Sequence, residues 1–245
     1  MRRAGRPAEP PSAAPGTAAD GGLLVRARDL LVGYTGQPVS PPTTFAVVPG
    51  AATALVGLNG AGKTTVLKAV LGQLAPLGGE LEVLGGPVDE RSVAFRRAVA
   101  SVLDVDVQLP GLTVREHLDL VARGHGVRDA DDVVDQAVLD LGLEPVAENP
   151  ATALSSGQRR RMLLAAALVR PRRLLVLDEP EQRLDLAGRE DVVDRLVEEK
   201  EAGVGLLLAT HDPLLLAEVA DEVLLLSEDG VLPVTAAEAA RELGR

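Results

Sequence analysis

The sequence predicts an α/β fold in which a mostly parallel sheet, with an antiparallel β portion, carries an inserted helical lobe. Two observations support this prediction. From residue 23 onward, short runs rich in Leu and Val alternate with helical patterns, which is typical of a sheet covered by helices. Between about residues 104 and 169, strand signals become scarce and helical patterns dominate. We therefore expect a helical lobe at about 104–169.

Eight runs are predicted to be strands, at residues 23–27, 44–48, 53–56, 81–84, 99–103, 174–177, 206–209 and 223–226. Several of these runs are apolar throughout, as expected of parallel strands that are buried on both faces. In the lobe, Thr113 and Glu116 predict a capping box at the start of a helix. Thr235 and Glu238 repeat this pattern before a final helix.

The chain is expected to form a single domain over residues 23–230. Residues 1–22 contain no apolar stretch of the kind found in secretory signals, so this segment is not expected to be one. Their Pro, Ala and Gly content predicts a disordered tail. Residues 231–245 are predicted to form a strand-and-helix extension beyond this domain.

The composition restricts the classes of partner. Among 245 residues, Asp and Glu number 36 against 25 Lys and Arg, which gives a formal net charge of −11. This acidic excess repels a phosphate backbone, and aromatic residues at 1% are too few for a base-stacking platform, so no nucleic acid partner is expected. The absence of Cys excludes disulfides and thiolate zinc sites. Every apolar run falls short of the roughly 18 residues that a membrane-spanning helix needs.

The segment GLNGAGKTT, residues 57–65, matches the phosphate-loop pattern G-x-x-x-x-G-K-[ST] and lies between a predicted strand and a predicted helix. Glycines let backbone N–H groups converge on phosphates, and the positive end of the following helix faces the same anion. A lysine at this spacing neutralises the β- and γ-phosphates, and the next hydroxyl ligates Mg²⁺. A plain Gly-rich turn before a helix is the alternative. The candidate nucleotide-binding residues here are Gly57, Asn59, Gly60, Gly62, Lys63, Thr64 and Thr65.

The run LLVLDE is an aliphatic strand that ends in two carboxylates, Asp178 and Glu179. A strand end beside a phosphate loop is where an acidic residue reaches the Mg²⁺ sphere, so Asp178 joins Thr64 as a candidate metal ligand. Glu179 is then the candidate general base that polarises the attacking water. Taken alone, such an acidic pair is also typical of a helix cap or a solvated turn.

The segment LSSGQR, residues 154–159, opens a predicted helix, and its amides and hydroxyls form a second anion-binding surface. An ordinary N-cap by Ser155 or Ser156 is the alternative interpretation. A single chain has no evident use for two phosphate sites.

Four segments follow one another in the order GLNGAGKTT, LSSGQ, LLVLDEP and LLLATHD, with the helical stretch between the first two. With this set and order, the chain resembles the ATP-binding cassette family, the nucleotide-binding subunits of ABC transporters, from residue 23 to about 226. The resemblance implies a P-loop NTPase core, Mg²⁺-dependent ATP hydrolysis and a head-to-tail dimer of like or unlike nucleotide-binding subunits. It also implies a separate membrane permease as partner and a cytoplasmic position at the inner face of the cell membrane.

The resemblance also implies roles for single residues. His211 looks like the histidine that contacts the γ-phosphate, Tyr34 like the aromatic that stacks on adenine, and Asp185 like the aspartate that communicates across the dimer. Taken alone, His211 is also typical of a hydrogen-bonded strand end, and Tyr34 of an edge strand. The signature segment that closes over the ATP of the partner chain corresponds to Ser155, Ser156, Gly157 and Gln158. His117 and His125 match no motif and are expected at the surface.

The chain departs from the family pattern in three places. Asp104 stands where the family has a glutamine that touches Mg²⁺ and senses the membrane partner, and Gln108 lies four residues later. Asp104 is therefore a further candidate metal ligand, with Gln108 as the alternative for that role. Ser156 replaces a glycine of the signature, and Glu181 and Arg183 replace the usual Thr and Gly.

The leading functional prediction is an ATPase subunit that powers transport through a separate membrane permease. One alternative is an ABC-type ATPase that serves a soluble assembly partner. Another is a nucleotide-sensing module that binds ATP without hydrolysing it.

Overall fold

The computed structural model describes residues 22–103, 111–227 and 230–243. Its centre is a six-stranded sheet in the order β12-β11-β5-β10-β9-β8. The five strands from β11 to β8 are parallel to their neighbours, and β12 pairs antiparallel with β11. The strand bounds are β5 Ala52–Val56, β8 Val99–Val102, β9 Leu174–Asp178, β10 Gly205–Ala209, β11 Glu222–Ser227 and β12 Gly230–Val234.

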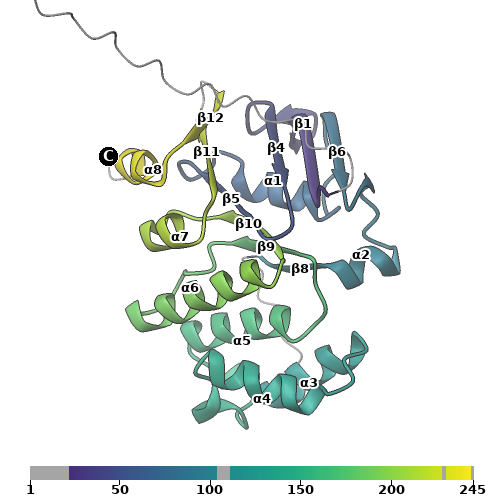
Figure 1. The fold of residues 1–245 in the computed structure, drawn as a ribbon, viewed down its shortest axis with the longest axis vertical. Coiled ribbons are helices and arrows are strands. Elements are labelled where there is room, and N and C mark those ends of the chain that lie inside the picture. Colours follow the sequence, from purple (N-terminus) through teal and green to yellow (C-terminus); the bar gives the residue numbers. More distant parts are fainter. Residues whose placement is uncertain (1–21, 104–110, 228–229, 244–245) are drawn as a thin grey trace, which may run out of the picture.

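A second sheet of four antiparallel strands, in the order β4-β1-β6-β7, packs beside the first (Figure 1). Its strands are β1 Val25–Leu31, β4 Thr43–Val47, β6 Gly78–Val83 and β7 Gly86–Pro87. A small hairpin of β2 Gly33–Tyr34 and β3 Gln37–Pro38 projects from it. The predicted combination of a mostly parallel sheet with an antiparallel portion is confirmed.

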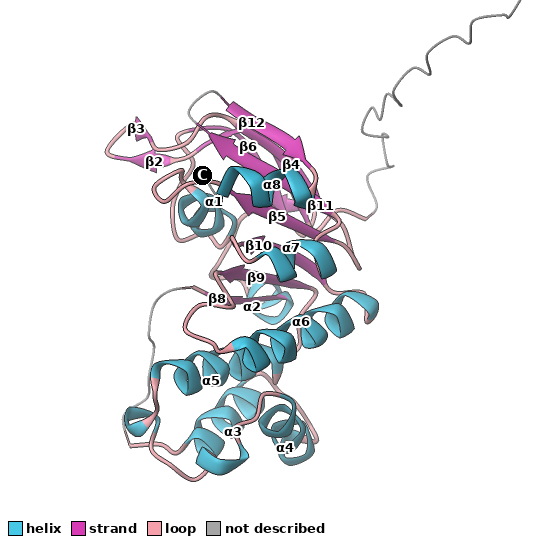
Figure 2. Ribbon diagram, turned by 90° about the vertical axis from the view of Figure 1, so that its left-hand side faces the viewer, coloured by secondary structure: helices cyan, strands magenta, loops and turns pink. Residues whose placement is uncertain are grey.

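The helices cover the six-stranded sheet from both sides, as Figures 1 and 2 show. Between β8 and β9 the chain forms the helical lobe of α3, α4, two 3-10 turns and α5. The lobe elements are α3 Val114–Gly124, α4 Ala130–Asp140, η1 Glu144–Val146, η2 Ala151–Ala153 and α5 Ser156–Leu168. The remaining helices are α1 Lys63–Val70, α2 Val93–Ala98, α6 Leu186–Glu201, α7 Pro213–Glu218 and α8 Ala236–Leu243.

The central strands are mostly aliphatic because each of their faces meets a separate core. In β9, Leu175 and Leu177 belong to the core shared with α5 and α6, whereas Leu174 and Val176 belong to the core shared with α1 and the antiparallel sheet. Side chains alternate between the faces of a strand, so a strand with cores on both sides has no polar face to present. The carboxyl ends of these buried strands carry the candidate site.

All eight predicted strands overlap observed strands, and both predicted capping boxes are present. Thr113 accepts a hydrogen bond from Glu116 N, and Glu116 Oε2 accepts one from Thr113 N at 2.8 Å. Thr235 and Glu238 exchange the same pair of bonds. The strands β2, β3 and β7 and the helix α2 were not predicted; the three strands have only two residues each, too few to show the alternation that identifies a strand.

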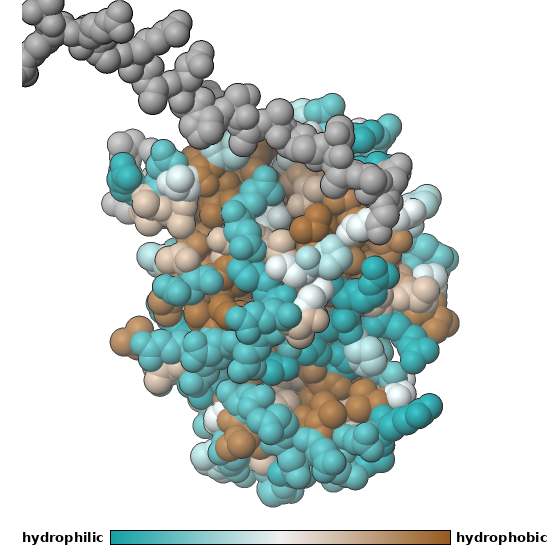
Figure 3. Space-filling view, in the orientation of Figure 1, coloured by the Kyte–Doolittle hydropathy of each residue, from teal (hydrophilic) through white to brown (hydrophobic). Residues whose placement is uncertain are grey.

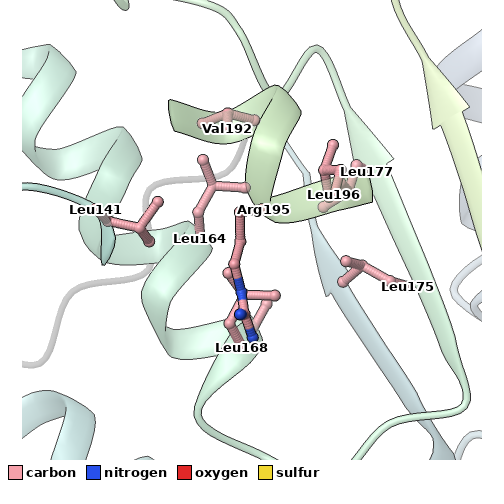
Figure 4. A pocket seen from close by; sticks show the side chains of 9 residues that line it. Leu141, Leu164, Leu168, Leu175, Leu177, Val192, Arg195 and Leu196 are labelled. Carbon is pink, nitrogen blue, oxygen red and sulfur yellow. The ribbon is translucent and has the colours of Figure 1, made fainter. Parts of the chain in front are cut away.

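One narrow hollow of the core lies between α5, α6 and β9 (Figure 4). Its lining is aliphatic apart from Arg195, whose charged end forms ion pairs with Glu198 and Glu199. None of the candidate phosphate-binding residues lines it, so it belongs to helix packing. On the surface that faces the viewer in Figure 1, hydrophilic and hydrophobic side chains are intermixed, as Figure 3 shows.

Candidate active site

The phosphate loop joins β5 to α1, and its glycines are required by the backbone. Gly62 caps α1 with φ of 92°, in the left-handed region that favours glycine. A Cβ at Gly57 would lie 2.4 Å from the carbonyl oxygen of Leu226, and a Cβ at Gly62 would lie 2.8 Å from the side chain of Ser40. The loop therefore packs too closely for side chains at these two positions, and α1 begins directly at Lys63.

Lys63 is only 6% exposed and folds back over the loop that precedes it. Its Nζ donates to the carbonyl oxygen of Gly57 at 2.6 Å and to that of Leu58 at 3.2 Å. Burial lowers the pKa of Lys63, and the nearby carboxylates of Glu179 and Asp178 oppose this shift. The ammonium group is thus held at the phosphate loop with the two carboxylates in range of its charge.

Asp178 ends β9 and meets the first turn of α1. The Thr64 hydroxyl donates to Asp178 Oδ2 at 2.7 Å, which brings together two residues 114 positions apart. Burial raises the pKa of Asp178, while the hydrogen bond from Thr64 lowers it. A hydroxyl and a carboxylate beside a phosphate loop form the small oxygen ligand set that suits Mg²⁺, which takes one or two protein oxygens and fills its other positions with water and substrate phosphate.

Glu179 and His211 face each other across the ends of β9 and β10. His211 Nε2 lies 2.6 Å from Glu179 Oε1, and Gln182 Nε2 donates to the other oxygen, Oε2, at 3.2 Å. Glu179 has φ of 47°, an uncommon conformation for a residue with a side chain. Its backbone N–H donates to Ala209 O at 2.7 Å and so fixes the turn. Both oxygens of the candidate base are therefore oriented by neighbours.

Arg160 supports this turn from α5 and was not among the predicted site residues. Its guanidinium is buried and donates to the carbonyl oxygens of Asp178, of Glu179 at 2.6 Å and of Pro180 at 3.5 Å. The Arg160 side chain thus donates to three consecutive backbone carbonyls. The available signal was the run of three arginines after Gln158, since one of three consecutive helical residues must face the core.

Ser155 is the N-cap of α5 and forms a capping box with Gln158. Ser155 N donates to Gln158 Oε1 at 2.9 Å, and Gln158 N donates to Ser155 Oγ at 3.3 Å. The ordinary capping role of Ser155 is therefore present in the single chain. A Cβ at Gly157 would lie 2.9 Å from the carbonyl oxygen of Arg183, so the start of α5 packs closely against the segment after β9.

Asp185 caps α6 and is joined to α5. Its Oδ1 accepts from Gly188 N at 3.0 Å and from Arg161 Nη2 at 3.1 Å. The bond from Gly188 lowers the pKa of Asp185, as expected of an N-cap carboxylate. Helix α5, which begins within the LSSGQ segment, is thus bonded to the start of α6, a few residues after Glu179.

The remaining predicted residues lie outside this cluster. Tyr34 is 46% exposed in the β2–β3 hairpin. His117 is only 5% exposed, so its predicted surface position is wrong: it shares the inward face of α3 with Val114 and Leu118. Burial lowers the pKa of His117. Asp104 and Gln108 fall outside the residues that the structure describes.

A comparison of the sequence with known protein families identifies the family of this chain. Residues 42–182 match the sequence profile of the ABC transporter family. This chain belongs to the ABC transporter family. The match begins before β4 and ends after Glu179, so it includes the phosphate loop, the helical lobe and the LSSGQ segment.

Individual ABC proteins resemble the chain over most of its length. It is 34% identical to the SkfA peptide export ATP-binding protein SkfE of Bacillus subtilis strain 168, over 77% of this chain and 79% of that protein. It is 35% identical to the zinc import ATP-binding protein ZnuC of Pseudomonas entomophila strain L48, over 83% and 75% respectively. A solved ATP-binding subunit of an ABC transporter has a TM-score of 0.79 at 30% identity and covers 90% of this chain and 93% of its own.

The chain is therefore an ATP-binding subunit of the ABC transporter class. Proteins of this class are generally ATPases and work with membrane permease components. Within the described ranges, no helix combines the length and apolar character required to span a bilayer.

Proposed function

We propose that this ABC subunit hydrolyses ATP with Mg²⁺ and that hydrolysis drives transport through a separate membrane permease at the inner face of the cell membrane. The observation that carries this proposal is the pair formed by Glu179 and His211, 2.6 Å apart, beside the buried Lys63 and the Thr64–Asp178 contact. A site that only held a nucleotide would need the phosphate loop without an oriented base.

In the proposed reaction, the backbone N–H groups of residues 57–65 bind the phosphates at the positive end of α1. Lys63 neutralises the β- and γ-phosphates, and Tyr34 stacks on the adenine. When bound, Mg²⁺ supplies further neutralisation of phosphate charge, with Thr64 and Asp178 as its protein ligands and Asp104 as a further candidate. Glu179 accepts a proton from the attacking water, and His211 contacts the γ-phosphate and holds the Glu179 carboxylate.

The proposed site is completed by a second nucleotide-binding subunit. Ser155, Ser156, Gly157 and Gln158 stand at the positive end of α5, where their amides and hydroxyls can take an anion. In one chain, Gly157 lies against residues 183 and 184 of the segment after β9. We assign these four residues to the ATP of the partner subunit and Asp185 to communication between the two sites.

Substitution Glu179→Gln tests the proposed base. The amide keeps the shape and the contact with His211 but cannot accept the proton, so we expect steady-state ATP turnover to fall about 100-fold or more while ATP binding is retained. Turnover is measured by phosphate release and binding by equilibrium dialysis with ATP. Glu190→Gln, at an exposed position of α6, is the matched control and should leave turnover unchanged. Full turnover in Glu179→Gln would remove Glu179 from the base role.

The permease is tested with the same variant as bait. Tagged Glu179→Gln subunit is recovered from gently solubilised cells in ATP and Mg²⁺, and the proteins that accompany it are identified by mass spectrometry. A stoichiometric membrane protein with several spans supports the transporter. Recovery of soluble proteins alone, with bound ATP demonstrated, favours an ATPase that serves a soluble assembly.

A further inference from the structure

Three consecutive residues after β10 are each bonded to the segment that follows β9. The contacts join Thr210 Oγ1 to Glu181 Oε1 at 2.6 Å, His211 Nε2 to Glu179 Oε1 at 2.6 Å and Asp212 Oδ2 to Arg189 Nη1 at 3.0 Å. Only the middle contact belongs to the proposed reaction. The other two hold the residues on either side of His211.

Glu181 differs from the other residues of this set because it is buried while one oxygen of its carboxyl group has no hydrogen-bond partner in the part of the chain that the structure describes. It is 6% exposed, and its Oε2 has no hydrogen-bond partner among the described residues. Burial raises the pKa of Glu181, and the neighbouring carboxylates of Asp212 and Glu179 add to the shift. A buried carboxyl group with an unbonded oxygen costs folding free energy, so packing alone does not explain why the side chain is acidic.

The partner of Glu181 connects it to the backbone around His211. The Thr210 hydroxyl donates to Glu181 Oε1 and also accepts from Asp212 N at 3.0 Å. This one oxygen therefore connects Glu181 to the residues that precede and follow His211. Thr210 N in turn donates to Leu55 O at 3.3 Å, next to the strand end that leads into the phosphate loop. The bonded path therefore runs from the segment after Glu179, through Thr210, to the backbone that carries His211.

We propose that Glu181 is a positioning residue, which holds His211 against Glu179 by fixing the Thr210 hydroxyl. This inference rests on the proposed function of His211 in ATP hydrolysis. Glu181 touches neither the nucleotide nor the attacking water in this scheme. Its effect is exerted through the geometry of the loop at residues 210–212, so it should act on the rate of the chemical step and not on the affinity for ATP.

The experiment compares four variants in steady-state ATP turnover. Glu181→Leu removes the acceptor and Thr210→Val removes the donor, so each should lower kcat about tenfold and leave KM for ATP within about twofold. The double variant should be no slower than either single variant, because both changes break the same contact. Glu181→Gln keeps an acceptor for the Thr210 hydroxyl and should recover most of the kcat lost in Glu181→Leu. Glu190→Gln again serves as the control.

A second readout is independent of turnover. His117, His125 and His211 are the only three histidines of the chain, so their ring resonances are readily assigned by NMR. Thr210→Val and Glu181→Leu should move the His211 resonances and leave those of His117 and His125 in place, whereas Glu181→Gln should have little effect.

The two readouts separate the inference from the function on which it rests. A wild-type chain without ATP turnover would overturn the proposed function, while the His211 resonances would still test the coupling. Unchanged kcat with unmoved His211 resonances in Thr210→Val would overturn the role of Glu181. Additive losses in the double variant, or a Glu181→Gln variant as slow as Glu181→Leu, would overturn it as well. Should Glu181→Leu fail to fold, Thr210→Val and Glu181→Gln decide between the outcomes.

Discussion

At the scale of single residues, Arg160 connects stability to the active site. Its guanidinium donates to three successive carbonyls of the turn that carries Asp178 and Glu179, and the bonds to the carbonyls of Asp178 and Pro180 are buried. Buried carbonyls that lose their donor retain the full cost of desolvation. The side chain therefore maintains the path of the backbone that aims the candidate metal ligand and the candidate base.

We expect Arg160→Ala to lower the free energy of unfolding by about 1–3 kcal/mol or more and to reduce kcat for ATP. Urea denaturation and phosphate release measure the two effects. Arg115→Ala is the control, because Arg115 also has more than one partner but bonds to the carboxylates of Asp135 and Glu148 on an exposed surface, where ion pairs contribute about 0–1 kcal/mol. Equal losses in the two variants would contradict a special role for Arg160.

At the scale of elements, α3 and α5 begin with the same capping box, and this permits a clean comparison. Ser155 and Thr113 each cap their helix through the N3 backbone amide, and Gln158 and Glu116 return the bond. Substitution of either cap residue by Ala should cost about 1 kcal/mol of stability. Only the cap of α5 is assigned to ATP.

We therefore expect Ser155→Ala to reduce ATP turnover, whereas Thr113→Ala should lose similar stability with turnover unchanged. Urea denaturation verifies that the two structural costs match, and phosphate release compares the rates. A proportional loss of turnover in both variants would mean that Ser155 acts only as a helix cap.

The elements also show what sequence reasoning can reach. Runs such as residues 174–177 are predictable as strands because cores on both faces demand continuous aliphatic residues. The start of β6 was missed because Gly78, Gly79 and Glu80 carry no apolar signal; this part is a strand because Arg28 pairs with Glu80 in the antiparallel sheet.

The same distinction applies to the site. Lys63 and Asp178 were predictable because each belongs to a local motif: Lys63 to the phosphate loop that follows an apolar strand, and Asp178 to the end of another apolar strand. Arg160 and Thr210 do not, because their partners lie 18 to 29 positions away in the chain and meet them only after helix α5 and strand β10 pack against the turn after β9. The burial of His117 was missed for a related reason, since the inward face of α3 is defined by the neighbouring helices.

At the scale of the whole molecule, the proposed catalytic unit contains two chains. In one chain, Thr64 of the phosphate loop contacts Asp178, whereas Gly157 of the LSSGQ segment lies against residues 183–184. A second subunit placed head to tail would bring its LSSGQ segment to the bound ATP. ATP would then lie between the subunits and contribute to their association.

We expect the Glu179→Gln variant to be a dimer in ATP and Mg²⁺ and a monomer without nucleotide, because bound ATP is retained when hydrolysis is blocked. Size-exclusion chromatography with light scattering gives the mass directly. Adding Lys63→Ala to this variant should abolish the dimer, whereas adding Lys68→Ala, in the last turn of the same helix, should preserve it. A monomer under all conditions would exclude a dimer of like chains held by ATP.

The exposed hairpin of β2 and β3 has an optical consequence. Tyr34 is the only tyrosine of the chain, the sequence contains no tryptophan, and both phenylalanines are buried. The tyrosine fluorescence of the protein therefore arises from one side chain, at the position assigned to adenine, and no tryptophan emission overlies it. A stacked base quenches such a ring, so the natural protein already contains a label-free reporter at a single position, whose signal follows nucleotide arrival and release in real time.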